Sequence, residues 1–301
     1  MVDKQAKYSD YIKNSYPHIE ISKIEYNLID GIHNDIVIIN DKHVFKFAKY
    51  DWSVGFLDNE VSFINFVKRY ITMPLPRIEA PEKGIATYNY IKGGPLFRNS
   101  LLLMDNKSQE MIAEQIGTFL RQLHSISFKA ESNKNISICP VSLSREDWLL
   151  QYEEIQKKIS PYCDSYTKEY LDQIFKPLLE NKNFLVFKPT LIHGDLMPYH
   201  ILTNKGSRRI NGIIGFGVSG IGDPAYDVGI ILDNLGEAFI KRIARYYKNI
   251  PLLIDRARFY AYINNFSWAK TISDMITTRD FTNFRVKPKD RDIMPIGSRW
   301  Y

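Results

Sequence analysis

The chain has 301 residues, of which 45% are hydrophobic and 25% charged, and its formal net charge is +6. This composition is typical of a globular protein and excludes a mainly disordered, collagen-like or proline-rich chain. No apolar run approaches the ~18 residues of a membrane span, the N-terminus has no signal-like stretch, and there are only two cysteines. We therefore predict a cytoplasmic protein that has no disulfide framework and no membrane partner.

The basic excess is spread thinly along the chain. Residues 1–92 are neutral, and residues 281–301 carry five basic and two acidic side chains. A nucleic-acid-binding protein more often concentrates its charge in one dense stripe or patch. We therefore expect no nucleic acid among the partners, and we expect the last 21 residues to form a solvated, basic tail.

The first 92 residues predict a β-rich unit. Residues 54–70 place apolar side chains on one broad face and predict a single helix. Pro74 and Pro76 follow this helix and favour an extended segment at a sheet edge. Four further segments are rich in β-branched and aromatic residues or alternate in polarity, and we predict strands over residues 21–29, 35–40, 43–50 and 84–91.

After the turn at 93–95 the chain becomes mostly helical. One helix is predicted to end near His124, and a compact non-helical block over 189–223 holds two short strand-like runs. Further apolar patterns of helical period predict helices over residues 145–159, 164–181, 225–248 and 253–276. We therefore divide the chain into three parts, which are residues 1–92, 93–280 and 281–301.

The block 191–202 contains the residues most able to carry chemistry. Asp195 lies in a turn after a short apolar run, and His200 begins the next strand-like run. Residues 213–217 then read I-I-G-F-G, and residues 222–227 read G-D-P-A-Y-D. An isolated Asp in a turn often serves only as a cap, and an isolated His is usually structural. The grouping of these residues in one pattern favours a functional interpretation.

This pattern resembles the aminoglycoside phosphotransferase family, in which H-G-D-x-x-x-x-N/H-I-L is followed by I-I-D-F-G and G-D-P-x-x-D. The resemblance covers nearly all of residues 20–275. It implies an α+β, bilobal, protein-kinase-like fold, with a β-rich N-lobe that has one helix and a larger α-helical C-lobe. It also implies a small-molecule kinase that transfers the terminal phosphate of ATP or GTP to a hydroxyl of an aminoglycoside-type antibiotic or similar molecule.

The resemblance assigns roles to residues of the C-lobe, which would hold the catalytic loop and the substrate site. Asp195 would be the catalytic base, because a carboxylate must meet the incoming hydroxyl in phosphoryl transfer. His193, Asp223 and Asp227 would have structural roles near the site. His124, in the sequence L-H-S, would pack or cap the end of its helix.

In the N-lobe the resemblance implies a nucleotide site. Lys46, on the third predicted strand, would bind the phosphates, and Glu60 in the following helix would be its ion-pair partner. Lys49 is the alternative, but its odd spacing from Lys46 places it on the other face of the strand. Beyond these, the residues expected to contact the nucleotide are Gly31 in the first turn and Tyr90 and Ile91 in the hinge.

The chain departs from the family pattern at the metal site. Position 215, where the family has an Asp that holds Mg²⁺, is Gly215, which offers no side-chain oxygen. His200 stands where the family has Asn or His, and a neutral imidazole is a poor ligand for Mg²⁺. We therefore expect weakened Mg²⁺ binding and transfer slowed about a hundredfold or more. A nucleotide-binding pseudokinase without efficient turnover is the first alternative.

The sequence also leaves open which molecule accepts the phosphate. Aminoglycosides are polycations, and their kinases tend to line the acceptor cleft with carboxylates. After Asp227 the helical region has only Asp233 and Glu237 before a basic stretch over 241–245. Because acidic residues are few in this region, the second alternative is that the acceptor is a macrolide or a small hydroxylated metabolite.

Overall fold

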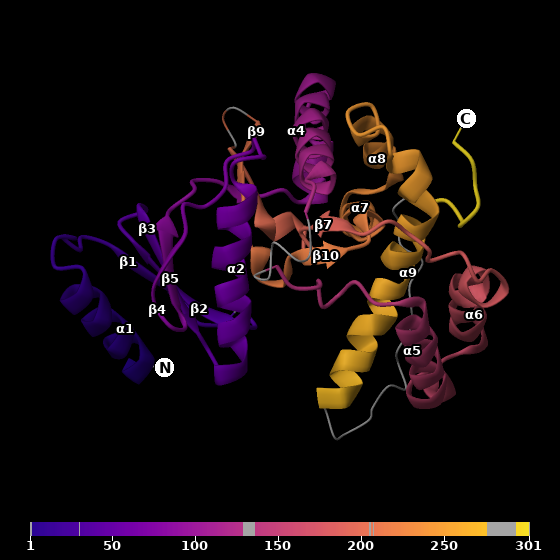
Figure 1. Ribbon diagram of the computed structural model, residues 1–301, viewed down its shortest axis with the longest axis horizontal. Coiled ribbons are helices and arrows are strands. Elements are labelled where there is room, and N and C mark those ends of the chain that lie inside the picture. The colour runs from indigo at the N-terminus through magenta and orange to yellow at the C-terminus, as the bar shows by residue number, and fades with distance from the viewer. Residues whose placement is uncertain are drawn as a thin grey trace.

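The computed structural model describes residues 2–29, 31–128, 136–204, 206, 208–275 and 293–300. An antiparallel sheet with flanking helices forms the N-terminal lobe, and a larger, mainly helical lobe follows it (Figure 1). This arrangement confirms the α+β organisation predicted from the sequence. Among the described residues, no helix has the length and apolar character that a membrane span requires.

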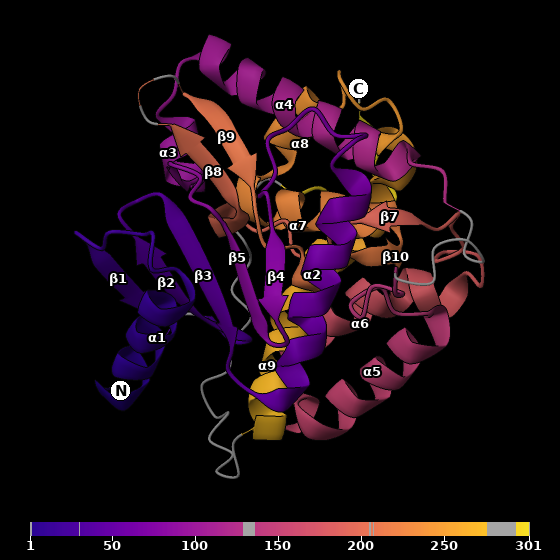
Figure 2. The ribbon, with the colours of Figure 1, turned by 60° about the vertical axis from the view of Figure 1, so that its left-hand side comes forward.

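The N-terminal lobe is built on a five-stranded antiparallel sheet with the order β1-β2-β3-β5-β4. Strand β4 lies at the edge of this sheet and contains Pro81, as expected for a segment rich in proline (Figure 2). The strands are β1 Ile24–Asn27, β2 Asn34–Ile39, β3 His43–Ala48, β4 Glu79–Glu82 and β5 Ile85–Asn89.

The two faces of this sheet pack against different partners. Phe45 and Phe47 of β3 contact α1 (Val2–Ser15), and the ring of Phe47 stacks on Tyr8 with centroids 4.1 Å apart. Val44 points the other way, toward α2 (Val54–Val67) and the main core. Because side chains alternate along a strand, Lys46 shares the inner face with Val44. The N-terminal lobe thus has two long helices, and the prediction of only one is wrong.

The C-terminal lobe is mainly helical. The predicted single helix over 225–248 is wrong, because Gly236, with a φ of 89°, separates α7 from α8. The helices are α3 Arg98–Leu102, α4 Asn106–Ser125, α5 Arg145–Lys158, α6 Ser165–Glu180, α7 Pro224–Leu235, α8 Glu237–Ile243 and α9 Ile250–Met275. Short 3₁₀ turns among the described residues are η1 Asp51–Ser53 in the N-terminal lobe and η2 Ser160–Tyr162, η3 Pro198–His200 and η4 Phe216–Val218 in the C-terminal lobe.

Two small sheets hold the loops between the lobes. Strand β7 (Thr190–Ile192) pairs with β10 (Gly220–Gly222), and β8 (Ile201–Asn204) lies between β6 (Gly94–Pro95) and β9 (Arg209–Ile213). Both sheets are antiparallel. They anchor the two ends of the segment 193–200 and the two ends of the segment 214–219, so these loops are fixed side by side.

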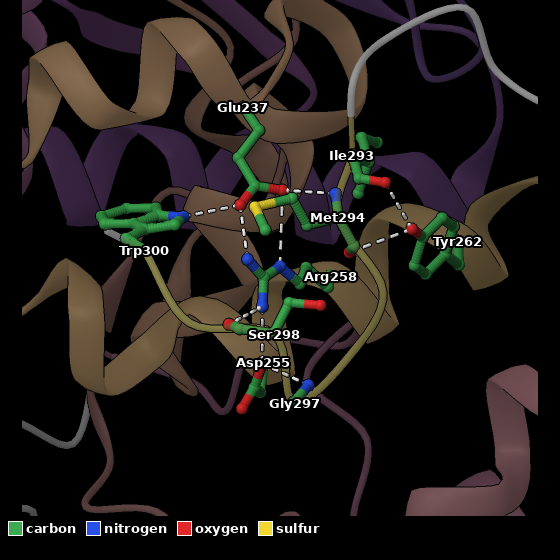
Figure 3. Close-up of polar contacts among 9 residues, drawn as sticks. All are labelled: Glu237, Asp255, Arg258, Tyr262, Ile293, Met294, Gly297, Ser298 and Trp300. Carbon is green, nitrogen blue, oxygen red and sulfur yellow. Dashed lines mark hydrogen bonds and ion pairs between the residues drawn. The ribbon is translucent and has the colours of Figure 1, made fainter.

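The C-terminal segment 293–300 packs on the helical lobe, so the expectation of a solvated tail is wrong for these residues. The Trp300 indole donates a hydrogen bond of 2.6 Å to Glu237, whose carboxylate also binds Arg258 (Figure 3). The Arg258 side chain is fully buried and donates to the Ser298 carbonyl at 2.8 Å. The rest of the predicted tail, residues 281–292, lies outside the described residues.

Candidate functional site

A cavity of about 210 Å³ between the lobes brings together most of the residues singled out in the sequence. Side chains and loops from both lobes line it, so its shape depends on how the lobes pack. The predicted site residues that line this cavity are Gly31, Lys46, Glu60, Asp195, His200 and Gly215.

A buried ion pair lies on the N-lobe side of this cavity. The Lys46 ammonium is 2.8 and 2.7 Å from the two carboxylate oxygens of Glu60, and both side chains are almost fully buried. Burial alone would lower the pKa of Lys46, but the neighbouring Glu60 carboxylate raises it above its usual value. The lysine is therefore a fixed positive charge at the cavity wall, and Glu60 orients it.

Lys49 has a different role from Lys46. It lies 3.5 Å from the buried carboxylate of Asp35 and donates a hydrogen bond to the Gly31 carbonyl. The predicted opposite orientation of Lys49 is consistent with these contacts. Lys49 thus fastens the turn that carries Gly31 over the cavity, and Lys46 is the lysine that lines the cavity itself.

The Asp227 carboxylate fixes the loop that carries Asp195. It accepts hydrogen bonds of 2.8 Å from the main-chain N–H groups of both His193 and Gly194, and it lies 3.1 Å from the ring of His124. Burial on its own raises the pKa of Asp227, but these hydrogen bonds and the neighbouring His124 hold it below its usual value. Asp227 therefore stays ionised inside the core and holds the main chain before Asp195.

The His193 ring links this loop to the neighbouring loop through two hydrogen bonds. Its Nε2 donates to the Ile214 carbonyl at 3.0 Å, and its Nδ1 accepts the Asp195 N–H at 3.2 Å. This pattern requires the neutral imidazole, and burial indeed lowers the pKa of His193. The structural role predicted for His193 agrees with these contacts, since the ring joins the two loops at the cavity floor.

The Asp195 side chain is the partly open carboxyl of this loop, with 36% of its surface exposed. Burial raises its pKa from the usual 3.8 to about 7, and a hydrogen bond from the Tyr199 hydroxyl offsets part of this rise. A carboxyl with a pKa close to neutral accepts and releases a proton readily at physiological pH. Asp195 therefore has the chemical character expected of a general base.

The cavity does not provide a set of ligands suited to Mg²⁺. Gly215 follows β9 and has no side chain, and burial lowers the pKa of the neighbouring His200 to about 3, so its ring is neutral. Mg²⁺ prefers six oxygen ligands and rarely takes imidazole nitrogen. In the part of the chain that the structure describes, no group of three or more His, Cys, Asp or Glu side chains could hold a metal ion. The residues present do not fit Mg²⁺.

Two predicted nucleotide-contacting residues, Tyr90 and Ile91, lie elsewhere. They line a separate hollow of about 400 Å³ on the segment that joins the lobes, together with Lys92 and Asn211. The Tyr90 N–H is already bonded to the Lys42 carbonyl at 2.7 Å. These two residues are therefore not part of the cavity wall formed by Lys46 and Asp195.

Asp223 is also away from the cavity. Its carboxylate caps α7 by accepting the Ala225 N–H at 2.9 Å and pairs with the Arg256 guanidinium at 2.8 and 3.1 Å. The Tyr260 hydroxyl donates a further hydrogen bond of 3.0 Å to it. These contacts agree with the structural role predicted for Asp223, which ties the start of α7 to α9.

A second cavity of about 450 Å³, which we call the acceptor pocket, adjoins the first on the C-lobe side, and Asp195 lines both. Most of its lining is apolar, and the described residues that line it include no carboxylate besides Asp195. Sequence patterns did not identify its side chains, because they come from seven separate segments. They include Ile32, Phe56, Pro140, Val141, Met197, Val218, Tyr226, Ile230 and Asn264.

Comparison with known proteins identifies close structural relatives. The model of the phosphotransferase enzyme family matches residues 27–262. A mutant of aminoglycoside 2'-phosphotransferase IIIa in complex with GDP is 25% identical, with a TM-score of 0.81 over 92% of this chain and 93% of that one. The macrolide 2'-phosphotransferase type I is 16% identical, with a TM-score of 0.71 over 92% and 94% of the two chains. These similarities confirm the predicted kinase-like fold.

Proposed function

Because the chain belongs to this phosphotransferase enzyme family, we propose that it binds ATP or GTP between its lobes and transfers the terminal phosphate to a hydroxyl of a small molecule. The observation that carries this proposal is the position of Asp195. This carboxyl, with a pKa of about 7, lines both the cavity that contains Lys46 and the acceptor pocket. A proton acceptor at the junction of two cavities suits a transfer between two bound molecules.

The proposed chemistry is an in-line displacement at phosphorus. The acceptor hydroxyl gives its proton to Asp195 as its oxygen bonds to the terminal phosphorus, and the bond from that phosphorus to the leaving diphosphate oxygen breaks. The Lys46 ammonium, held by Glu60, neutralises charge on the phosphates. Asp227 keeps the loop of Asp195 in place through its two main-chain hydrogen bonds.

The missing carboxylate at position 215 lowers the expected rate. Without an anionic ligand at this position, charge that develops on the phosphates is neutralised mainly by Lys46 among the described lining residues. We therefore expect transfer to be about a hundredfold or more slower than with a complete site. The second candidate function, a nucleotide-binding module without efficient turnover, is favoured by this same observation.

The lining of the acceptor pocket favours an acceptor molecule with few positive charges. The proposal drawn from the family resemblance is an aminoglycoside-type acceptor, and one of the similar structures is a complex of such an enzyme with GDP and kanamycin. An aminoglycoside bears several positive charges and requires carboxylates around it. A pocket whose described lining has Asp195 as its single carboxylate instead favours a macrolide-type or other mainly apolar acceptor.

The test is nucleotide-dependent transfer of labelled phosphate with the full chain, using kanamycin and erythromycin as acceptors. We expect product with ATP or GTP, formed faster on the macrolide, and formed at least about a hundredfold more slowly by the Asp195→Asn variant. Tight nucleotide binding without any product on an acceptor panel would instead support the binding module. Faster transfer to kanamycin would contradict the inference from the pocket lining.

A further inference from the structure

The side-chain space beside Gly215 is filled by another residue. Gly215 has a φ of 85°, and a Cβ built on it would lie 2.5 Å from the Cδ2 and Cε1 ring atoms of His200, with Nε2 also in contact. Side-chain carbon atoms essentially never approach other atoms this closely. The imidazole of His200 therefore occupies the volume in which a side chain at position 215 would begin.

The ring of His200 is held in this place. Its Nδ1 lies 2.7 Å from the Asp195 carbonyl oxygen and donates a hydrogen bond to it, and the ring of Tyr199 packs edge-on at 4.5 Å. The main chain of the residue is fixed as well, because its carbonyl accepts the Ile214 N–H at 3.0 Å. Since Nδ1 carries the proton, Nε2 bears a lone pair, and Nε2 is the atom turned toward Gly215.

The charges that line this cavity differ from those of a site with a carboxylate at position 215. Among the described residues that line the cavity, the acidic and basic side chains are Lys46, Glu60 and Asp195, beside the imidazole rings of His33 and His200. A carboxylate at position 215 would add a negative charge next to the phosphates, and a divalent cation would be needed to offset the repulsion. An imidazole ring at the same place brings neither a carboxylate ligand for the metal nor the negative charge that requires the metal.

We propose that His200 and Gly215 form one interlocked pair, in which the ring takes the place of a side chain at position 215 and makes nucleotide binding by this chain independent of a divalent cation. This inference rests on the nucleotide binding proposed above. It differs from simple damage at position 215, because a damaged site would leave open space for the original side chain.

The steric part of the proposal is tested by thermal unfolding, without any ligand. Gly215→Ala introduces the Cβ that meets the ring, and we expect its Tm to fall by about 4 °C more than that of the control. The matched control is Gly297→Ala, because Gly297 has a φ of 89° with no atom within 4 Å of an added Cβ. The double variant Gly215→Ala with His200→Ala should recover most of this extra loss. Equal Tm losses in Gly215→Ala and Gly297→Ala would overturn the proposal, as would full additivity in the double variant.

The metal part is tested by calorimetric titration of ATP and GTP with Mg²⁺ and with EDTA. For the native chain we expect the Kd to differ by less than about threefold between the two conditions. In the double variant His200→Asn with Gly215→Asp, Mg²⁺ should tighten binding about tenfold, and bound Mn²⁺ should become visible by paramagnetic resonance. Gly215→Asp alone should gain no Mg²⁺ response, because the ring still fills the space.

The possible failures are distinguishable. Tenfold tighter binding of nucleotide to the native chain with Mg²⁺ overturns the further inference and leaves the proposed function standing. A Mg²⁺ response in Gly215→Asp alone also overturns it, since the ring is then no obstacle. If neither the native chain nor the double variant binds nucleotide under either condition, the proposed function fails, and metal independence fails with it.

Discussion

Replacing Asp195 with Asn should make the protein less active and, above neutral pH, more stable. In the folded chain burial raises the pKa of Asp195 from 3.8 to about 7. The folded state therefore resists ionisation of this carboxyl, and the unfolded state does not. Between about pH 4 and pH 7 the folded state binds more protons, so this group lowers the stability of the protein as the pH rises through that range.

The size of this effect follows from the shift and the exposure of the side chain. A shift of this size in a fully buried group corresponds to about 4 kcal/mol, at about 1.4 kcal/mol for each pKa unit. The carboxyl is 36% exposed, and water screens a large part of the cost. We therefore expect Asp195→Asn to raise the free energy of unfolding by about 1–2 kcal/mol at pH 8 and to leave it nearly unchanged at pH 4.

The assay is urea unfolding of both proteins at pH 4, 6 and 8, combined with transfer rates over the same range. Activity of the native chain should rise with pH through about 7 as Asp195 loses its proton, whereas the Asn variant should show no such rise and should be at least about a hundredfold slower at pH 8. If the difference in free energy of unfolding between the native chain and the Asn variant did not change with pH, the argument that burial raises the pKa of Asp195 would be refuted. An Asn variant with native activity would refute its role as the base.

Four other changes test neighbouring parts of the argument. Asp227→Asn should have the opposite sign to Asp195→Asn, with a loss of stability that is larger at pH 8 than at pH 3 in urea unfolding, because hydrogen bonds hold the pKa of Asp227 low. Tyr199→Phe removes a hydrogen bond that lowers the pKa of the Asp195 carboxyl, so the pH–rate profile should shift to higher pH. Lys46→Met should weaken ATP binding in a calorimetric titration and destabilise the fold by about 3–5 kcal/mol, because its carboxylate partner is left buried and unpaired. Trp300→Phe keeps an aromatic ring, although a smaller one, and loses the hydrogen bond to Glu237, so thermal unfolding should show a loss of about 1.5–3 kcal/mol.

Local patterns in the sequence predicted the parts of the site that the main chain carries. Lys46 reaches the cavity because strand side chains alternate, and Glu60 lies on the helix that packs against the same face of the sheet. Asp195 was identified from its motif, and the structure places its side chain on the wall shared by two cavities. In each case a short segment with regular geometry fixes the direction of the side chain.

Features that depend on contacts between distant segments were not predicted. Helix α1 has few apolar side chains, and it is stabilised by packing such as the stack of Tyr8 on Phe47. The segment 293–300 has no periodic pattern, and it is fixed by hydrogen bonds to a buried pair on α8 and α9. The acceptor pocket combines side chains from seven segments. None of these partners is visible within a single stretch of sequence.

The departure at position 215 shows why a motif cannot be interpreted one residue at a time. From the sequence, Gly215 is a missing ligand, and Gly215→Asp is the obvious repair. The structure shows that the ring of His200 stands where the new side chain would begin, and that a hydrogen bond to the Asp195 main chain holds it there. Restoring a carboxylate at position 215 therefore requires a change at position 200 as well, because the ring of His200 packs in the space that the new side chain needs. Whether this chain is a slow kinase or a binding module depends on that arrangement rather than on the glycine alone.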